Sequence, residues 1–115
     1  MGFKTTHNLD FEIAPWDKST DDPPWILFRI GTVNGIWRAN NKNYEILGIN
    51  NTHPHNGHLE DMFEWFLHSC KRDNYGLIIR EVWNGKFRKH LIKKRGFTPI
   101  SKYDVALTGS DAINQ

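Results

Sequence analysis

The sequence contains a single cysteine, Cys70, and it has neither an internal repeat nor a long apolar run. One cysteine excludes an intrachain disulfide and a zinc site built from cysteines. No apolar stretch approaches the roughly 18–20 residues that a membrane-spanning helix needs, so we expect no membrane contact. The N-terminus also lacks the charged and then apolar pattern of a secretory signal. Together these absences predict a cytoplasmic protein.

Length and composition are typical of one globular domain. The chain has 115 residues, of which 38% are hydrophobic and 24% charged. A chain of this size can bury one core but not two. We therefore expect a single domain over residues 1–115, with an edge strand and a loop in 1–24, the core in 25–107 and a flexible tail in 108–115.

Charge is distributed unevenly along the chain. Residues 1–70 hold five Lys and Arg against nine Asp and Glu, whereas residues 71–115 hold ten against four. Six of those ten basic residues lie between positions 86 and 95. A cluster of this kind binds nucleic-acid phosphates or an acidic partner, or it forms a solvated basic face. Trp83 and Phe87 lie close to the cluster in sequence, where they would be able to stack on bases.

The first half of the chain has the pattern of a β-meander. Residues 25–30 are rich in aromatic and β-branched side chains and predict a strand. Asn34-Gly35 is a strong hairpin signal, which predicts a turn between that strand and residues 36–39. A polar turn at 40–43 then leads to a third strand over 44–49.

After residue 57 the apolar residues change to a helical period. They recur at i, i+3, i+4, i+7, i+8 and i+11, which predicts one buried helical stripe made of Leu59, Met62, Phe63, Phe66, Leu67 and Cys70. Asn56 is the expected N-cap of this helix. Trp65 lies off the stripe and is expected to be either a core residue or an oligomer contact. Cys70 lies on the stripe and is expected to be a core residue rather than a nucleophile.

The last third of the chain predicts a strand, a helix and closing strands. Residues 75–83 form an apolar run of strand length. Asn84 is a suitable N-cap for a second helix that ends at Gly96, and residues 97–107 suggest one or two further strands. The predicted fold class is therefore α+β, with a mixed, mainly antiparallel sheet and two main helices.

This order of elements, with its landmarks, resembles the GNAT superfamily of N-acetyltransferases over roughly residues 25–107, and it is similar to small phage-encoded GNAT-like proteins. Residues 44–49 correspond to the family's central splayed strand, His53-Pro54 to the His-Pro after it, and Gly96-Phe97 to the Gly-Phe that ends its second helix. The resemblance implies acetyl-CoA as cofactor and transfer of its acetyl group to an amine acceptor by direct attack.

The resemblance also implies a coenzyme A site near the start of the first helix, where unpaired backbone N–H groups bind the pyrophosphate. The positions that it implies are Ile49, Asn50, Asn51, Asn56, Gly57, His58, Leu59 and Asn84. The family loop reads Arg/Gln-x-x-Gly-x-Gly/Ala, whereas the loop here has one glycine and no Arg or Gln. Glu60 and Asp61 follow directly, and at 4 Å each like-charge pair would cost roughly 1 kcal/mol in water.

His53 and His55 are candidate general bases, because imidazole titrates near neutral pH, and Glu45 on the central strand is a third. The family's Tyr, which protonates the leaving thiolate, corresponds to Ile92, so Tyr103 on the following strand is the candidate acid. The competing hypothesis is a non-catalytic GNAT-like protein used for binding or assembly, for example as a phage virion component.

The histidines allow one further interpretation. His53, His55 and His58 match the spacing H-x-H-x-x-H, in which neutral imidazoles are able to ligate zinc. The alternative is a polar loop whose histidines are exposed to solvent or cap the helix, and this is the interpretation that we expect.

Overall fold

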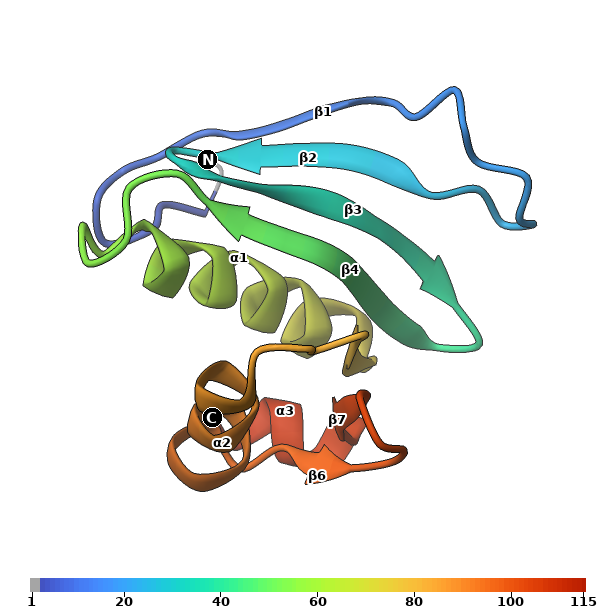
Figure 1. Ribbon diagram of the computed structural model, residues 1–115, viewed down its shortest axis with the longest axis vertical. Coiled ribbons are helices and arrows are strands. Elements are labelled where there is room, and N and C mark those ends of the chain that lie inside the picture. Colours follow the sequence, from blue (N-terminus) through green and yellow to red (C-terminus); the bar gives the residue numbers. More distant parts are fainter. Residues whose placement is uncertain (1–2) are drawn as a thin grey trace.

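An antiparallel meander of four strands forms the first half of the chain in the computed structural model, which describes residues 3–115 (Figure 1). The strands are β1 (Phe11–Pro15), β2 (Ile26–Ile30), β3 (Val33–Asn40) and β4 (Asn43–Asn51). The second half contains α1 (His58–Asp73), β5 (Gly76–Arg80), α2 (Gly85–Arg95), β6 (Thr98–Pro99), β7 (Val105–Leu107) and α3 (Gly109–Ile113). This is the expected α+β class, with a third helix in addition.

All strands in the described residues belong to one mixed sheet with the order β1-β2-β3-β4-β5-β7-β6. Only the β4–β5 pair is parallel, because α1 is the crossover that connects these two strands. The helix runs beneath β2–β4 in Figure 1, and one hydrophobic cluster joins α1 to the sheet, to Leu91 of α2 and to Ala112 of α3.

The first hairpin turn lies three residues earlier than the sequence predicts. The turn between β2 and β3 is Gly31-Thr32, whereas Asn34 and Gly35 lie inside β3 at a register shift. Gly35 is required there for packing, because a Cβ at this position would lie 2.9 Å from Cε1 of Phe28. The second turn lies within the predicted residues 40–43, with Asn41 and Lys42 both at positive φ.

The apolar stripe of the first helix is confirmed. Met62, Phe63, Phe66 and Cys70 are all fully buried. Burial raises the pKa of the Cys70 thiol to about 12, which is consistent with the predicted core role. Trp65 does not need an oligomer partner, because it stacks on Phe11 of β1 with a centroid distance of 3.5 Å.

The second helix has the predicted ends. The Asn84 side chain accepts hydrogen bonds from the backbone N–H groups of Lys86 and Phe87, and Gly96 ends the helix in the left-handed conformation.

Among residues 3–115, no helix has both the length and the apolar character that crossing a membrane requires.

The C-terminal tail is a correction to the sequence prediction. Residues 108–115 were expected to be flexible, but Gly109–Ile113 form α3, whose Ala112 is fully buried in the common core. The Thr108 side chain caps this helix by accepting a hydrogen bond from the Asp111 N–H. Two adjacent apolar residues, Ala112 and Ile113, in a polar segment give no periodicity, so the packing of α3 against α1 is visible only in the structure.

The buried position of Ala112 gives a test of this docking. Replacing Ala112 with Asp places a carboxylate in the core, and we expect the free energy of unfolding to fall by more than about 2 kcal/mol. Ser110→Asp makes the same charge change at an exposed position of the same helix and should leave stability within about 0.5 kcal/mol. Equal denaturation midpoints for the two variants would contradict a docked α3.

Candidate functional site

A hollow lies where the two parallel strands separate. β4 pairs with β5 only from Asn43 to Leu47, although β4 continues to Asn51. Beyond Leu47 a cavity of about 230 Å³ opens between the strands and α2. It is lined by Gly48, Ile49, Ile79, Arg80, Glu81, Val82, Trp83, Asn84 and Phe87. Two of the predicted cofactor residues, Ile49 and Asn84, therefore meet at this hollow.

One wall of the hollow is made by a sharp change of chain direction after β5. Glu81 has a φ of 54°, which lies in the left-handed region that non-glycine residues rarely adopt. Its N–H donates to Oδ1 of Asp104 at 2.8 Å, and the Val82 N–H donates to the Tyr103 carbonyl at 2.7 Å. These two hydrogen bonds hold Glu81 in its strained backbone conformation. In the next two residues, the Val82 side chain is buried and the Trp83 side chain is exposed.

An aromatic pair stands at the rim of the hollow. Trp83 is 67% exposed, which is unusual for so large an apolar side chain. Its ring lies against that of Tyr103, with 3.9 Å between the centroids, and the Lys102 ammonium lies 5.3 Å from the Tyr103 ring. The predicted acid Tyr103 is thereby brought next to the hollow through its contact with Trp83.

Glu45 is buried in an ion-pair network. Its carboxylate lies 2.6 Å from Nε of Arg80 and 3.4 Å from Nε of Arg38, and Arg80 also contacts Asp104. Burial alone would raise the pKa of Glu45, but the hydrogen bond and the charge of Arg80 outweigh it and hold the pKa below its usual value. A carboxylate stabilised in this way is a poor proton acceptor, so its role here is to position Arg80 in the wall of the hollow.

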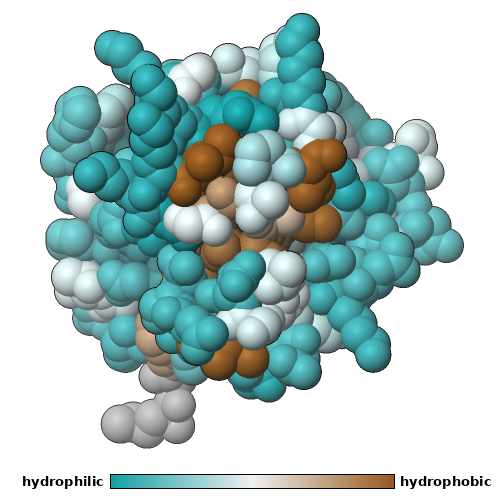
Figure 2. Space-filling model, turned by 90° about the horizontal axis from the view of Figure 1, so that it is seen from below, coloured by the Kyte–Doolittle hydropathy of each residue, from teal (hydrophilic) through white to brown (hydrophobic). Residues whose placement is uncertain are grey.

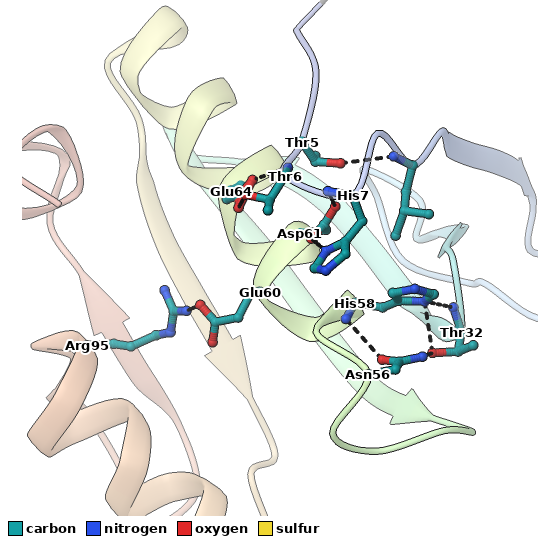
Figure 3. A network of polar contacts seen from close by, with 11 residues as sticks. Thr5, Thr6, His7, Thr32, Asn56, His58, Glu60, Asp61, Glu64 and Arg95 are labelled. Atoms are coloured by element: carbon teal, nitrogen blue, oxygen red, sulfur yellow. Dashed lines mark hydrogen bonds and ion pairs between the residues drawn. The ribbon is translucent and has the colours of Figure 1, made fainter.

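The loop before α1 is ordered by its own polar side chains (Figure 3). Asn56 accepts a hydrogen bond from the His58 N–H at 3.0 Å and donates to the Thr32 hydroxyl at 2.8 Å. Nδ1 of His58 accepts from the Thr32 N–H at 3.1 Å. The predicted N-cap Asn56 is wrong by one position: the cap is Gly57, at a φ of 87°, and Asn56 supports the first turn from the residue before it.

The N-terminal segment is fastened to the first turns of α1. Asp61 is fully buried, and its carboxylate accepts hydrogen bonds from the His7 backbone N–H at 2.8 Å and from His7 Nδ1 at 2.6 Å (Figure 3). The Thr6 backbone N–H and hydroxyl both donate to the Glu64 carboxylate. Burial alone would raise the pKa of Asp61, but the hydrogen bonds from His7 and Thr5 lower it. We call this set of contacts, made by Thr5, Thr6 and His7 with Asp61 and Glu64, the N-terminal clasp.

The clasp changes the electrostatics expected at the helix start. Asp61 is hydrogen-bonded by His7, and Glu60 forms an ion pair with Arg95 of α2. Both carboxylates that would repel an anion thus have partners within the chain. The His7 ring itself lies directly over Gly57, where an added Cβ would approach it to 2.6 Å.

The remaining histidines do not converge. His53 and His55 are exposed in the loop after β4, where the His53 ring lies 3.1 Å from the Thr52 hydroxyl and the His53 N–H donates to Oδ1 of Asn51. His58 is turned toward Thr32 instead. Within residues 3–115 there is no group of three or more His, Cys, Asp or Glu side chains placed to hold a metal ion.

Several residues of these two regions were not found from the sequence. His7, Arg38, Arg80 and Glu81 have no motif around them, and their partners lie between 7 and 54 positions away. Trp83, an aromatic residue beside the basic segment, was the one sequence feature that pointed to this part of the site.

No family model matches the chain, and no curated protein shows significant similarity to it.

The His7–Asp61 contact predicts a pH-dependent stability. Because the pKa of Asp61 is lower in the folded chain than in the unfolded chain, its contribution is present at neutral pH and is lost as the pH falls through the folded value. Asp61→Asn should therefore lower the free energy of unfolding by about 2 kcal/mol at pH 7, and the difference from wild type should narrow toward pH 3.

Urea denaturation at both pH values measures this effect. Glu64→Gln removes a more exposed carboxylate of the same clasp and should change stability by less than about 1 kcal/mol. A constant gap between wild type and Asp61→Asn over the whole pH range would show that Asp61 does not carry the effect as an ion.

Proposed function

We propose that the hollow between β4 and β5 binds an acyl-CoA and that the protein is an N-acyltransferase of the GNAT type. The observation that carries this proposal is the separation of the two parallel strands past Leu47, with a cavity at that point. The resemblance of the sequence assigns residues 44–49 to the splayed strand of that family. A splayed pair in this position is what an acyl-CoA site of that type requires.

The chemistry of the hollow suits the pantetheine arm of coenzyme A. No strand in residues 3–115 pairs with the β5-facing edge of β4 from Gly48 to Asn51. A linear chain with two amides is able to pair with such an edge, as an added strand does. The walls formed by Ile49, Val82 and Phe87 would contact its methylene groups.

The start of α1 provides the complementary site for the pyrophosphate. The positive end of the helix favours an anion, and the N–H groups of its first turn other than that of His58, which donates to Asn56, would be the donors. Of the residues that the resemblance implies, Gly57, His58 and Leu59 supply this turn, while Asn50 and Asn51 end the strand before it. The ion pair of Glu60 with Arg95 and the hydrogen bonds of Asp61 with His7 reduce the repulsion that the bare sequence suggests.

In the proposed reaction, acetyl-CoA supplies a thioester whose carbonyl carbon is attacked by the nitrogen of an amine. The C–N bond forms, the C–S bond breaks, the amine loses a proton and the leaving sulfur gains one. We assign Tyr103 as the proton donor, because it is fixed at the rim of the hollow by Trp83. His53 or His55 is assigned as the acceptor in preference to Glu45, whose carboxylate is held by Arg80 and Arg38.

Filling the hollow tests the binding part of the proposal. Wild-type protein titrated with acetyl-CoA should show a rise in melting temperature, and Ile49→Trp should weaken the apparent affinity at least about tenfold by occupying the space of the pantetheine arm. Ile13→Trp is the matched control, because it introduces the same side chain on exposed β1, outside the hollow. The absence of any shift for the wild type at millimolar acetyl-CoA would overturn the proposal.

The chemical part is tested with Tyr103→Phe. We expect release of free coenzyme A thiol, measured with a panel of primary amines, to fall by about 10²-fold while acetyl-CoA still shifts the melting temperature. Tyr75→Phe, a partly buried tyrosine outside the hollow, should keep wild-type turnover. Binding without turnover in the wild type would instead favour the non-catalytic binding or assembly protein.

A further inference from the structure

The exposed face of α2 is a continuous cationic stripe. Its members recur at i, i+3, i+4, i+7 and i+8, and all are exposed: Lys86, Lys89, His90, Lys93 and Lys94. These positions span about 12 Å along the helix axis at 1.5 Å per residue. The helix contains no acidic residue. We call these five residues the basic stripe.

Within the described residues 3–115, no ion pair compensates the lysines of the basic stripe. Arg95, on another face of the same helix, is paired with Glu60. Four lysines within two and a half turns repel one another at low ionic strength. A solvated face that served only for solubility would normally alternate in sign, so this arrangement favours a polyanionic partner.

An aromatic platform adjoins the stripe at the start of the helix. Trp83 precedes Lys86 by three residues, is 67% exposed and lies against Tyr103, and Lys102 contacts the Tyr103 ring. Figure 2, which views the molecule from the side where α2 and β6 lie in Figure 1, shows that this face also carries other apolar side chains near its centre, with projecting hydrophilic side chains around them. Aromatic rings beside lysines are the combination that binds unpaired bases together with their phosphates.

We propose that α2 and the Trp83–Tyr103 pair form a binding surface for single-stranded nucleic acid. The lysines of the basic stripe contact successive phosphates, and a base stacks on Trp83. A single strand is favoured over a duplex because a ring can stack only on a base whose face is free. The surface needs no acyl group, so it stands independently of the proposed transferase activity.

Fluorescence anisotropy with a labelled 12-residue oligo(dT) measures this binding. Lys89→Glu combined with Lys93→Glu should weaken it at least about tenfold at 50 mM salt, and Trp83→Ala should weaken it about tenfold through the loss of stacking. The matched control is Lys4→Glu combined with Lys18→Glu, which changes the net charge equally at exposed positions outside α2 and should bind as wild type does. With four lysines engaged, the logarithm of affinity should fall with the logarithm of salt concentration with a slope of about −3.

Three results would overturn the proposal: no binding at 50 mM salt, equal weakening by the two double variants, or tighter binding to the corresponding duplex. Lys89→Gln combined with Lys93→Gln provides an intermediate loss without introducing acids, which guards against a folding defect in the Glu variant. Both lysine variants should retain the acetyl-CoA shift of the wild type, because neither lysine lines the hollow. Failure of nucleic-acid binding is therefore distinguishable from failure of acyl-CoA binding.

Discussion

Burial of the apolar stripe of α1 is the interaction on which the other elements depend. Met62, Phe63 and Phe66 are completely removed from solvent, and side chains from both halves of the chain pack on them. Phe28 of β2 meets Phe66 edge-on, and Phe97, directly after α2, meets Phe63. Each fully buried large side chain contributes about 1.5–3 kcal/mol relative to exposure. The sheet, α2 and α3 are thus held by one helix.

The same helix explains why a hollow exists. β4 and β5 are parallel and therefore need a crossover connection, which is α1, so the loop after β4 leaves the sheet before the helix begins. β5 ends at Arg80, where Glu81 turns the chain into the left-handed region, while β4 continues to Asn51. Unequal strand ends beside a crossover leave backbone groups without a partner at the carboxyl end of β4. A ligand that has its own amides can satisfy them.

Local signals in the sequence predicted the elements whose stability is local. The stripe of α1, the Asn84 cap and the Gly96 stop are all in the structure, because each depends on residues within a few positions. Asn34-Gly35 misled for the opposite reason: Gly35 is used for close packing under Phe28 rather than for a turn. The docking of Ala112 and the N-terminal clasp depend on contacts between residues far apart in sequence. A local sequence pattern cannot predict such contacts.

The residues of the candidate site also fall into those predicted from the sequence and those found only in the structure. Ile49, Asn84 and Tyr103 were predicted and lie at or beside the hollow, whereas Arg80 and Glu81 complete it through partners that only the folded chain brings together. Trp83 is common to the hollow and to the aromatic platform at the end of the basic stripe. It is fixed by Tyr103 on one side and by the strained turn at Glu81 before it, so little conformational entropy remains to be lost when a ligand covers it. An exposed ring that is held by a neighbouring ring is suited to stacking, and under the two proposals a nucleic acid on α2 would reach the mouth of the hollow.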